Sequence, residues 1–190
     1  MIGAIVLAAG SSSRMGRPKA MLETGPGGLT FADAIVATAC AAGVSAVRVV
    51  VAPGFERSGP SYVVNPDPGA GMLSSIHCGL DAIQEQVDAV LVWPVDHPFV
   101  RLETIVAMIA AFRTGSPPIV VPTHDGKRGH PVLFAARVFP ELFTADPSYG
   151  ARAVVHAHGD RVELAVSDHG VVEDIDTPED YALHFKVRVS

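Results

Sequence analysis

Three hydroxyls and two cations follow the first apolar run of the chain. Residues 2–7 are apolar, Gly10 follows closely, and serines 11–13 lead to Arg14 and Lys19. Backbone N–H groups in such a loop can form an anion-binding concavity, because glycine has no Cβ and permits close approach. Arginine forks onto phosphate oxygens, and lysine supplies a mobile point charge. The stretch predicts a polyphosphate-binding loop; an ordinary turn would explain Gly10 but not the two cations together.

Two familiar phosphate loops are absent from this stretch. A Walker loop places four residues between its first glycine and a Gly-Lys-Ser/Thr sequence, whereas five residues separate Gly10 from Gly16 and Lys19 follows three residues later. In the dinucleotide fingerprint Gly-x-Gly-x-x-Gly, Ser12 takes the place of the second glycine. The loop therefore represents a different class of phosphate binder.

A lone carboxylate follows an apolar strand in the middle of the chain. Residues 89–95 are apolar, and Asp96 stands between Pro94 and Pro98. Ligands of open α/β sheets gather at the carboxyl ends of strands, so we expect Asp96 to face a ligand. The alternative is an Asx-type turn cap. His97 is interpreted as a turn residue.

Two further segments carry polar groups toward the same kind of site. Ser74 and Ser75 are expected to begin a helix running to about Gln86, whose free N–H groups and positive dipole end suit an anion or a polar base. Near the end of the chain, Asp174 and Asp176 alternate along the backbone. We therefore expect both carboxylates to point to one face.

The elements that must position these residues alternate between strands and helices. This alternation predicts a parallel, three-layered α/β sheet. A polar loop over residues 123–131 between two apolar runs adds an antiparallel excursion. The expected strands are 2–7, 44–52, 61–64, 89–96, 117–122, 132–134 and 161–166. The expected helices are 30–42, 74–86, 102–112, two short ones within 138–158, and one starting at 177.

Composition limits the classes of partner. The chain has 190 residues, taken as one domain over 1–190, with a net charge of −6 that argues against sequence-independent nucleic-acid binding. No apolar run reaches the roughly 18 residues that a membrane span needs, and the N-terminal stretch does not resemble a signal peptide. Cys40 and Cys78 are expected to be buried thiols in a reducing cytosol. A soluble cytoplasmic protein is expected.

Five segments together resemble the MobA-like nucleotidyltransferases. Residues 7–19 match the signature L-A-A-G-x-S-x-R-M-G-x-x-K, and the double alanine looks most like molybdenum cofactor cytidylyltransferases. Residues 65–80 match N-P-x-x-x-x-G-M-x-x-S-[LI]-R-x-G-L, except that His77 replaces the common arginine. The other segments are similar to P-x-D-x-P (93–98), G-H-P-V-L-F (129–134) and D-I-D-T-P-E-D (174–180). The resemblance implies a Rossmann-like α/β fold with a mixed, mainly parallel sheet.

The resemblance also implies roles for individual residues. Arg14, Lys19 and Asp96 are the expected catalytic groups, and Asp96 with Asp174 or Asp176 would hold Mg²⁺, which favours hard oxygen ligands. His77, Gly129 and His130 are expected on the acceptor side. The expected nucleotide-binding residues are Leu7, Ala8, Ala9, Gly10, Ser11, Ser12, Arg14, Lys19, Ser74 and Ser75.

The expected reaction is the transfer of CMP from CTP to a phosphate-bearing acceptor, which the resemblance suggests is molybdopterin, with a molybdenum hydroxylase as a possible client. CTP is expected because Ala9 stands where the guanylyltransferases of the family resemble L-A-G-G, and its methyl leaves less room beside the base. Two alternatives stay open. One is an NAD(P)H-dependent oxidoreductase of the nicotine blue type; the other is a non-catalytic carrier of a nucleotide-bearing cofactor.

Overall fold

A single mixed sheet organises the molecule. The computed structural model describes residues 1–10, 15–55, 57, 59 and 61–187. Within them the strand order is β3-β2-β1-β4-β7-β5-β6, and β8 pairs with β5. The strands are β1 (Ile2–Ala8), β2 (Ala46–Val51), β3 (Tyr62–Val64), β4 (Ala89–Pro94), β5 (Ile119–His124), β6 (Lys127–Arg128), β7 (Val132–Ala135) and β8 (Val162–Ala165).

The four strands from β3 to β4 are parallel, and the antiparallel excursion lies next to them. β1 is flanked by β2 and β4, both parallel to it. β7 is antiparallel to both β4 and β5, whereas β8 is parallel to β5. The expected mainly parallel sheet with one antiparallel return is confirmed. All seven residues of β1 are buried, as a central strand covered on both faces requires.

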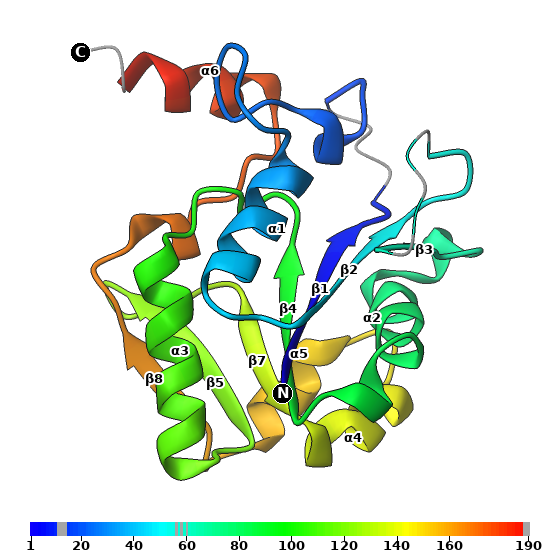
Figure 1. Cartoon of the computed structure of the whole chain (residues 1–190), viewed down its shortest axis with the longest axis vertical. Helices are drawn as coiled ribbons and strands as arrows, with labels where there is room; N and C mark the ends of the chain where they lie inside the picture. Colours follow the sequence, from blue (N-terminus) through cyan, green and yellow to red (C-terminus); the bar gives the residue numbers. More distant parts are fainter. Residues whose placement is uncertain (11–14, 56, 58, 60, 188–190) are drawn as a thin grey trace.

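Helices cover both faces of the sheet (Figure 1). Helices α1 and α3 contact each other, with α1 on β1 and β2 and α3 on β5 and β8, while α2 contacts β1, β2 and α4. The helices are α1 (Phe31–Ala41), α2 (Met72–Asp81), α3 (Leu102–Gly115), α4 (Phe139–Thr144), α5 (Ala151–Ala157) and α6 (Pro178–Val187), with short 3₁₀ turns at Lys19–Met21, Pro68–Ala70, Gln84–Gln86, Ala136–Val138 and His169–Val171.

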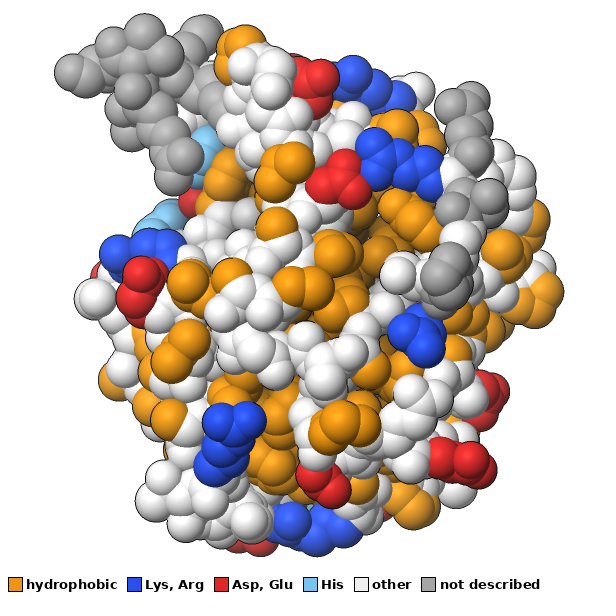
Figure 2. Space-filling model, viewed as in Figure 1, with side chains coloured by type: hydrophobic (Ala, Val, Ile, Leu, Met, Phe, Trp, Pro, Cys, Tyr) orange, Lys and Arg blue, Asp and Glu red, His pale blue; other side chains and the backbone are white. Residues whose placement is uncertain are grey.

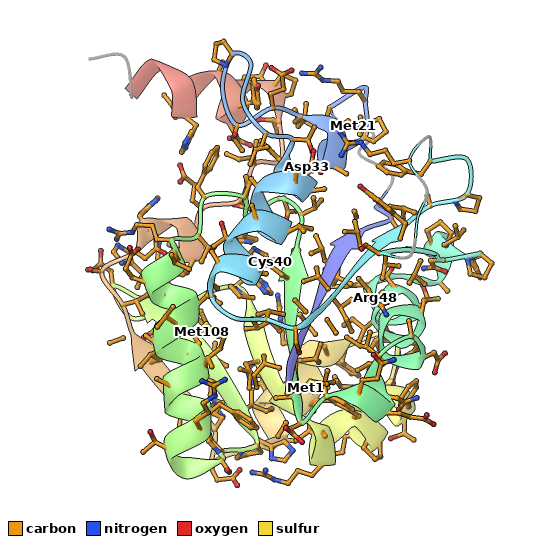
Figure 3. All side chains as sticks on the ribbon, in the orientation of Figure 1. Met1, Met21, Asp33, Cys40, Arg48 and Met108 are labelled. Atoms are coloured by element: carbon orange, nitrogen blue, oxygen red, sulfur yellow. The ribbon has the colours of Figure 1, made fainter. Side chains whose placement is uncertain are left out.

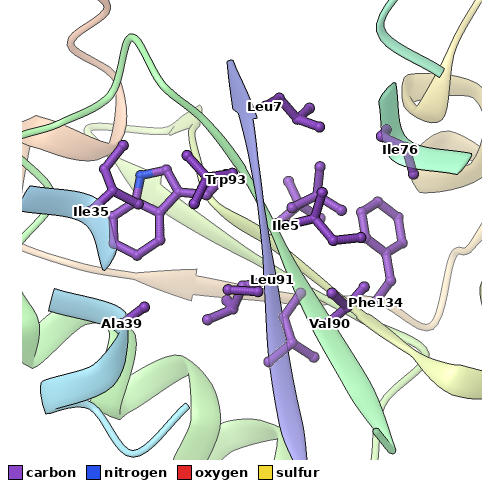
Figure 4. Close-up of a cluster of buried hydrophobic side chains, with 14 of the residues drawn as sticks. Ile5, Leu7, Ile35, Ala39, Ile76, Val90, Leu91, Trp93 and Phe134 are labelled. Carbon is purple, nitrogen blue, oxygen red and sulfur yellow. The ribbon is translucent and has the colours of Figure 1, made fainter. Parts of the chain in front are cut away.

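Side chains that alternate along the central strands divide the core into two halves. In Figure 4, Trp93 and Leu91 lie beside Ile35 and Ala39 of α1, whereas Ile5 lies on the side of Ile76 and Phe134. This is the two-residue period of a strand buried on both faces. The sheet is therefore the middle layer, and its strand ends are free to carry functional groups.

Helix α2 begins two residues earlier than expected. It starts at Met72, after Gly71 at φ 92°, and ends at Asp81, followed by a separate 3₁₀ turn. Ser74 and Ser75 therefore lie inside the first turn instead of preceding it. Gly71, at positive φ, breaks the chain directly before Met72, and the serines follow inside the helix.

Thr30 caps the start of α1. Thr30 Oγ1 accepts a hydrogen bond from Asp33 N at 3.2 Å and donates to Asp33 Oδ2 at 2.7 Å. Asp33 lies near the start of α1 and Cys40 near its end (Figure 3).

Both cysteines are free thiols, but Cys40 is exposed and Cys78 is half-buried, so the expectation that both are buried was wrong. Among the described residues, no helix is both long and apolar enough to span a membrane.

Candidate active site

The carboxyl ends of β1 and β4 lie side by side and set the position of the site. Leu7 of β1 is in register with Pro94 of β4, and Val95 N donates to Leu7 O at 3.1 Å. Ala9 and Gly10 follow one strand, and Asp96 follows the other. Parallel strands end at the same edge of a sheet, so two segments far apart in sequence meet there.

The turn that carries Asp96 is held by other groups. His97 N donates to Pro94 O, and the buried indole of Trp93 donates from Nε1 to His97 O at 2.9 Å. Within the described part of the chain, the Asp96 carboxylate makes no hydrogen bond to this backbone. The Asx-cap alternative therefore does not apply, and the carboxylate is available for another role.

Lys19 brings the phosphate loop to the two carboxylates. Its Nζ lies 3.2 Å from Asp96 Oδ2 and 2.5 Å from Asp176 Oδ1. Only 12% of the lysine side chain is exposed. The backbone beside it is anchored, because Ala20 and Leu22 are buried in the core. The expected convergence of Lys19, Asp96 and Asp176 is thus present.

The segment that carries Asp176 is attached at three points. Asp168 is buried and accepts from Arg101 N and Thr104 Oγ1 at the start of α3. Val171 O accepts from His130 N, and Ile175 N donates to Asp96 O at 2.9 Å. These contacts fix the backbone one residue before Asp176. No sequence signal pointed to Asp168, because Arg101 and Thr104 lie more than sixty residues away.

A cavity of about 340 Å³ opens over these groups. Figure 2 shows the surface hollowed over the ends of β1 and β4, with hydrophobic side chains in the hollow and charged ones at its edge. The cavity is lined by Leu7, Ala8, Ala9, Gly10, Lys19, Pro68, Gly71, Met72, Ser75, Pro94, Val95, Asp96 and Asp176. Apolar walls with a few charged groups at one end suit a ligand with a flat apolar part and a charged part.

A second cavity of about 600 Å³ adjoins the first. The two share Ala8, Ala9, Gly10 and Pro68. The rest of its lining comes from Gly16, Arg17, Pro18, Ala52, Pro53, Gly54, Phe55 and Gly69. The Ala8–Gly10 backbone thus separates two compartments at the end of β1.

Buried Asn65 shapes the cavity wall formed by residues 65–75. Its Nδ2 donates to Ser74 Oγ at 2.8 Å and Ser75 Oγ at 3.0 Å, and its Oδ1 accepts from Asp67 N at 2.9 Å. Ser75 is buried and lines the first cavity, whereas the Ser74 hydroxyl lies 2.8 Å from Gly71 O within the loop itself. Both serines therefore support the wall, and only Ser75 borders the cavity.

Two histidine rings pack together next to Asp96 in the chain: His97, which follows it, and His130. The rings of His97 and His130 are 4.9 Å apart, and His97 is buried. Burial, aided by the proximity of His97, lowers the pKa of His130 to about 4, so this imidazole is neutral near neutral pH. His97 is thus a buried residue packed beside His130, and not merely a turn residue. No sequence signal distinguished it, because its burial depends on the segment around Gly170, whose carbonyl faces His97 Nδ1 at 3.5 Å.

Two residues expected on the acceptor side have other partners. His77 Nε2 lies 2.9 Å from Leu142 O, and its ring stacks on Phe143 with centroids 5.1 Å apart. The ring therefore joins α2 to α4 and lines neither cavity described above, so the structure gives His77 a packing role. Gly129 allows a close approach, but to this chain's own backbone: a Cβ there would lie 2.2 Å from Val171 O.

The structure separates the two aspartates near the end of the chain. Asp176 lines the first cavity, whereas Asp174 is exposed and outside that lining. Buried Ile175 between them packs into the core. The expectation that both carboxylates share the ligand-facing side was therefore wrong. Ser11, Ser12 and Arg14 lie outside the described residues.

A divalent cation fits the remaining carboxylates. Asp96 Oδ1 is buried and has no hydrogen-bond partner among the described residues. Across those residues no group of three or more His, Cys, Asp or Glu could hold a metal ion. Two carboxylates suit Mg²⁺, which is usually bound through one or two carboxylates together with substrate phosphates and water.

The comparison with known families agrees with this geometry. The MobA-like NTP transferase domain matches residues 4–162. The chain belongs to this family. It is a nucleotidyltransferase of the family whose curated relatives are cytidylyltransferases.

Two curated relatives cover nearly the whole chain. The molybdenum cofactor cytidylyltransferase of Escherichia coli is 25% identical over 95% of this chain and 93% of its own length. The 2-C-methyl-D-erythritol 4-phosphate cytidylyltransferase of Streptomyces coelicolor is 35% identical over 90% of this chain and 68% of its own. The two relatives share the cytidylyl group in their names and differ in the acceptor.

A solved relative shares the fold over its full length. The crystal structure of Rv0371c from Mycobacterium tuberculosis superposes with a TM-score of 0.82 at 27% identity, covering 98% of each chain. The same protein has also been solved in complex with manganese, with a TM-score of 0.76. A divalent cation therefore binds a close structural relative.

Proposed function

We propose that this protein is a Mg²⁺-dependent cytidylyltransferase that transfers CMP from CTP to a phosphate-bearing acceptor, most closely molybdopterin, and releases pyrophosphate. The observation that carries the proposal is the meeting of Lys19, Asp96 and Asp176 beside the Ala8–Gly10 backbone. Cations and metal-binding carboxylates at the end of a strand are what a triphosphate requires.

Each group has a distinct task in this proposal. The Gly10 loop, with Ser11, Ser12 and Arg14, holds the triphosphate, and Lys19 neutralises the leaving pyrophosphate. Asp96 and Asp176 hold the divalent cation. That cation, when bound, would supply positive charge that offsets the negative charge of the triphosphate.

The chemical step needs no protein base. An oxygen of the acceptor phosphate attacks the α-phosphorus of CTP in line, and the bond to the bridging oxygen of pyrophosphate breaks. A phosphate is already ionised near neutral pH. The protein contributes by positioning the two substrates and stabilising charge on the leaving group.

Neutral His130 fits the acceptor side of the same site. Its ring lies beside that of His97, the residue after Asp96, and its pKa of about 4 keeps it uncharged in the working pH range. A neutral imidazole can donate one hydrogen bond to a phosphate without adding positive charge. His77 and Gly129 carry no acceptor contact in this proposal.

Ala9 is proposed to favour CTP over GTP. It is buried and borders both cavities, so its methyl occupies space next to the bound base. We expect Ala9→Gly to shift the CTP/GTP ratio of kcat/KM toward GTP by roughly tenfold, the size of one methyl group in a pocket. An unchanged ratio would remove Ala9 from the argument.

The deciding experiment is pyrophosphate release with two acceptors. Purified protein is incubated with CTP and Mg²⁺ and with either molybdopterin, the proposed acceptor, or 2-C-methyl-D-erythritol 4-phosphate, which the name of a curated relative contains. We expect release with molybdopterin, and its loss in Asp96→Asn. Pyrophosphate release only with the sugar phosphate would show that molybdopterin is not the acceptor. CTP binding without release from any acceptor would indicate a carrier and reject the proposal.

A cytoplasmic location with a molybdenum hydroxylase as client completes the proposal. Both cysteines are free thiols, as expected in a reducing compartment. Co-purification with a molybdenum hydroxylase from cell extract, lost when the nucleotide-binding loop is substituted, would test the client.

A further inference from the structure

Lys19 holds the place that a divalent cation needs. Its Nζ lies within hydrogen-bonding distance of one oxygen on each of the two carboxylates that face the cavity, Asp96 and Asp176. All three side chains are at least 70% buried, with 12%, 27% and 30% of their surfaces exposed. An ion that contacted these same oxygens would meet the ammonium at very short range.

We infer that Lys19 acts as a built-in counter-cation that keeps the metal site closed until a metal–nucleotide complex arrives, so that CTP and the divalent cation bind as one ligand. This inference rests on the proposed function. It adds an order of events, namely that the protein alone binds free divalent cation weakly and that nucleotide binding releases the carboxylates.

The repulsion between the ammonium and the incoming ion carries the first step of the argument. Two positive charges a few ångströms apart in a partly buried site repel far more strongly than they do in water. Asp96 Oδ1 is buried and has no hydrogen-bond partner among the described residues. The ammonium of Lys19 contacts the other oxygen, so Oδ1 is left able to bind a cation. The two carboxylates therefore attract a metal ion, while the ammonium of Lys19 occupies the space beside them.

The second step is that Lys19 can move without the loop moving. Its backbone begins a 3₁₀ turn closed by Leu22 N donating to Lys19 O at 3.0 Å, and both Ala20 and Leu22 are buried. The side chain itself is a compact charge on a flexible four-carbon stem. It borders the same cavity as Ala9 and Gly10, so a triphosphate there offers the ammonium new oxygen partners.

The third step is reciprocity. If the nucleotide draws Lys19 away from the carboxylates, the nucleotide raises metal affinity, and the metal must raise nucleotide affinity by the same factor. Replacing the lysine ammonium by the metal ion in this way makes the nucleotide and the metal bind cooperatively. Asp96 and Asp176 remain paired at all times, either with Lys19 or with the metal.

The test measures Mn²⁺ binding without nucleotide, by the electron paramagnetic resonance signal of free Mn²⁺. Lys19→Met is compared with wild type, and Lys127→Met on exposed β6 controls for the loss of one positive charge. We expect Lys19→Met to bind Mn²⁺ at least tenfold more tightly than wild type, and Lys127→Met to match wild type within twofold. Lys19→Arg, which keeps the charge, should stay weak.

A stability measurement guards against misfolding of the variant. Removing Lys19 leaves two carboxylates facing each other, so Lys19→Met should melt at a lower temperature in metal-free buffer. A ligand that binds only the folded state raises Tm. Millimolar Mn²⁺ should therefore raise the Tm of Lys19→Met by more than that of wild type.

Two results separate this inference from the proposed function. Equal Mn²⁺ affinity in wild type and Lys19→Met, within twofold and with equal Tm gains, overturns the inference even if pyrophosphate release proceeds. Absence of pyrophosphate release with either acceptor overturns the function whatever the metal binding shows.

Discussion

Lys19 Nζ lies 2.5 Å from Asp176 Oδ1 although 157 residues separate the two in the chain. The contact joins the loop after the first strand to the segment before the last helix. It places the segment before α6 at the ligand site. Asp176 and Asp96 there contact the same lysine ammonium.

The two aspartates around Ile175 make a matched pair for mutation. We expect Asp176→Asn to lower kcat/KM roughly 100-fold or more, because it removes a carboxylate proposed to hold the cation that offsets charge in the transition state. Asp174→Asn, at an exposed position outside the cavity lining, should stay within about threefold of wild type. Initial rates of pyrophosphate release measure both. Equal losses would mean that Asp174 reaches the site.

His77 is expected to matter for stability and not for acceptor binding. His77→Ala removes the hydrogen bond to Leu142 O and the stacking on Phe143, and should cost about 1–2 kcal/mol in the free energy of unfolding. kcat and the KM for the acceptor should not change. His156→Ala, at an exposed position of α5, is the control and should alter neither. A raised acceptor KM in His77→Ala would restore its acceptor role.

Gly79 sets how closely α2 approaches the sheet. A Cβ at this position would lie 2.4 Å from Ile5 Cγ2. Alanine favours a helix by about 1 kcal/mol over glycine, but the steric conflict should outweigh it and destabilise the protein by about 1–3 kcal/mol. Gly159→Ala, where nothing lies within 4 Å, should leave stability unchanged. Urea midpoints compare the two, and a more stable Gly79→Ala would contradict the packing argument.

His130 should make the metal-free protein less stable at mildly acidic pH. Its folded pKa is about 4, whereas an unperturbed histidine titrates near 6.5. Between these values the unfolded chain binds a proton that the folded protein does not, so the free energy of unfolding falls as pH falls. The loss approaches about 3 kcal/mol below pH 4 and is absent above pH 7.

The measurement for His130 is urea denaturation at pH 7 and at pH 4.5. Wild type should lose about 2 kcal/mol more between the two than His130→Gln, which has no group to titrate at that position. Comparing the two proteins at the same two pH values removes the contribution of other groups, such as Asp33. Burial raises the pKa of Asp33, but hydrogen bonds from Arg57 and Thr30 outweigh this effect and lower the pKa. Parallel pH profiles would show that His130 is not held neutral by the fold.

The difference between expected and observed elements follows the range of the interactions involved. The cap of α1 at Thr30 was predictable, because its partner Asp33 is three residues away. The start of α2 was placed two residues late, because the helix begins directly after Gly71 at φ 92° and not at the serines. The contacts of His77 with Leu142 and Phe143 of α4 were not predictable, because those residues lie 65 or more positions away in the chain.

The sequence by itself determined the strands, most of the helices, the phosphate-type loop and the carboxylate at the end of β4, because apolar periodicity and local turn chemistry act over a few residues. Only the tertiary structure decided which polar groups meet. Burial of Ile175 and the bond from its N–H to Asp96 O turn Asp176, and not Asp174, toward Lys19. Such choices depend on packing between segments more than seventy residues apart, and spacing along the chain carries no information about them.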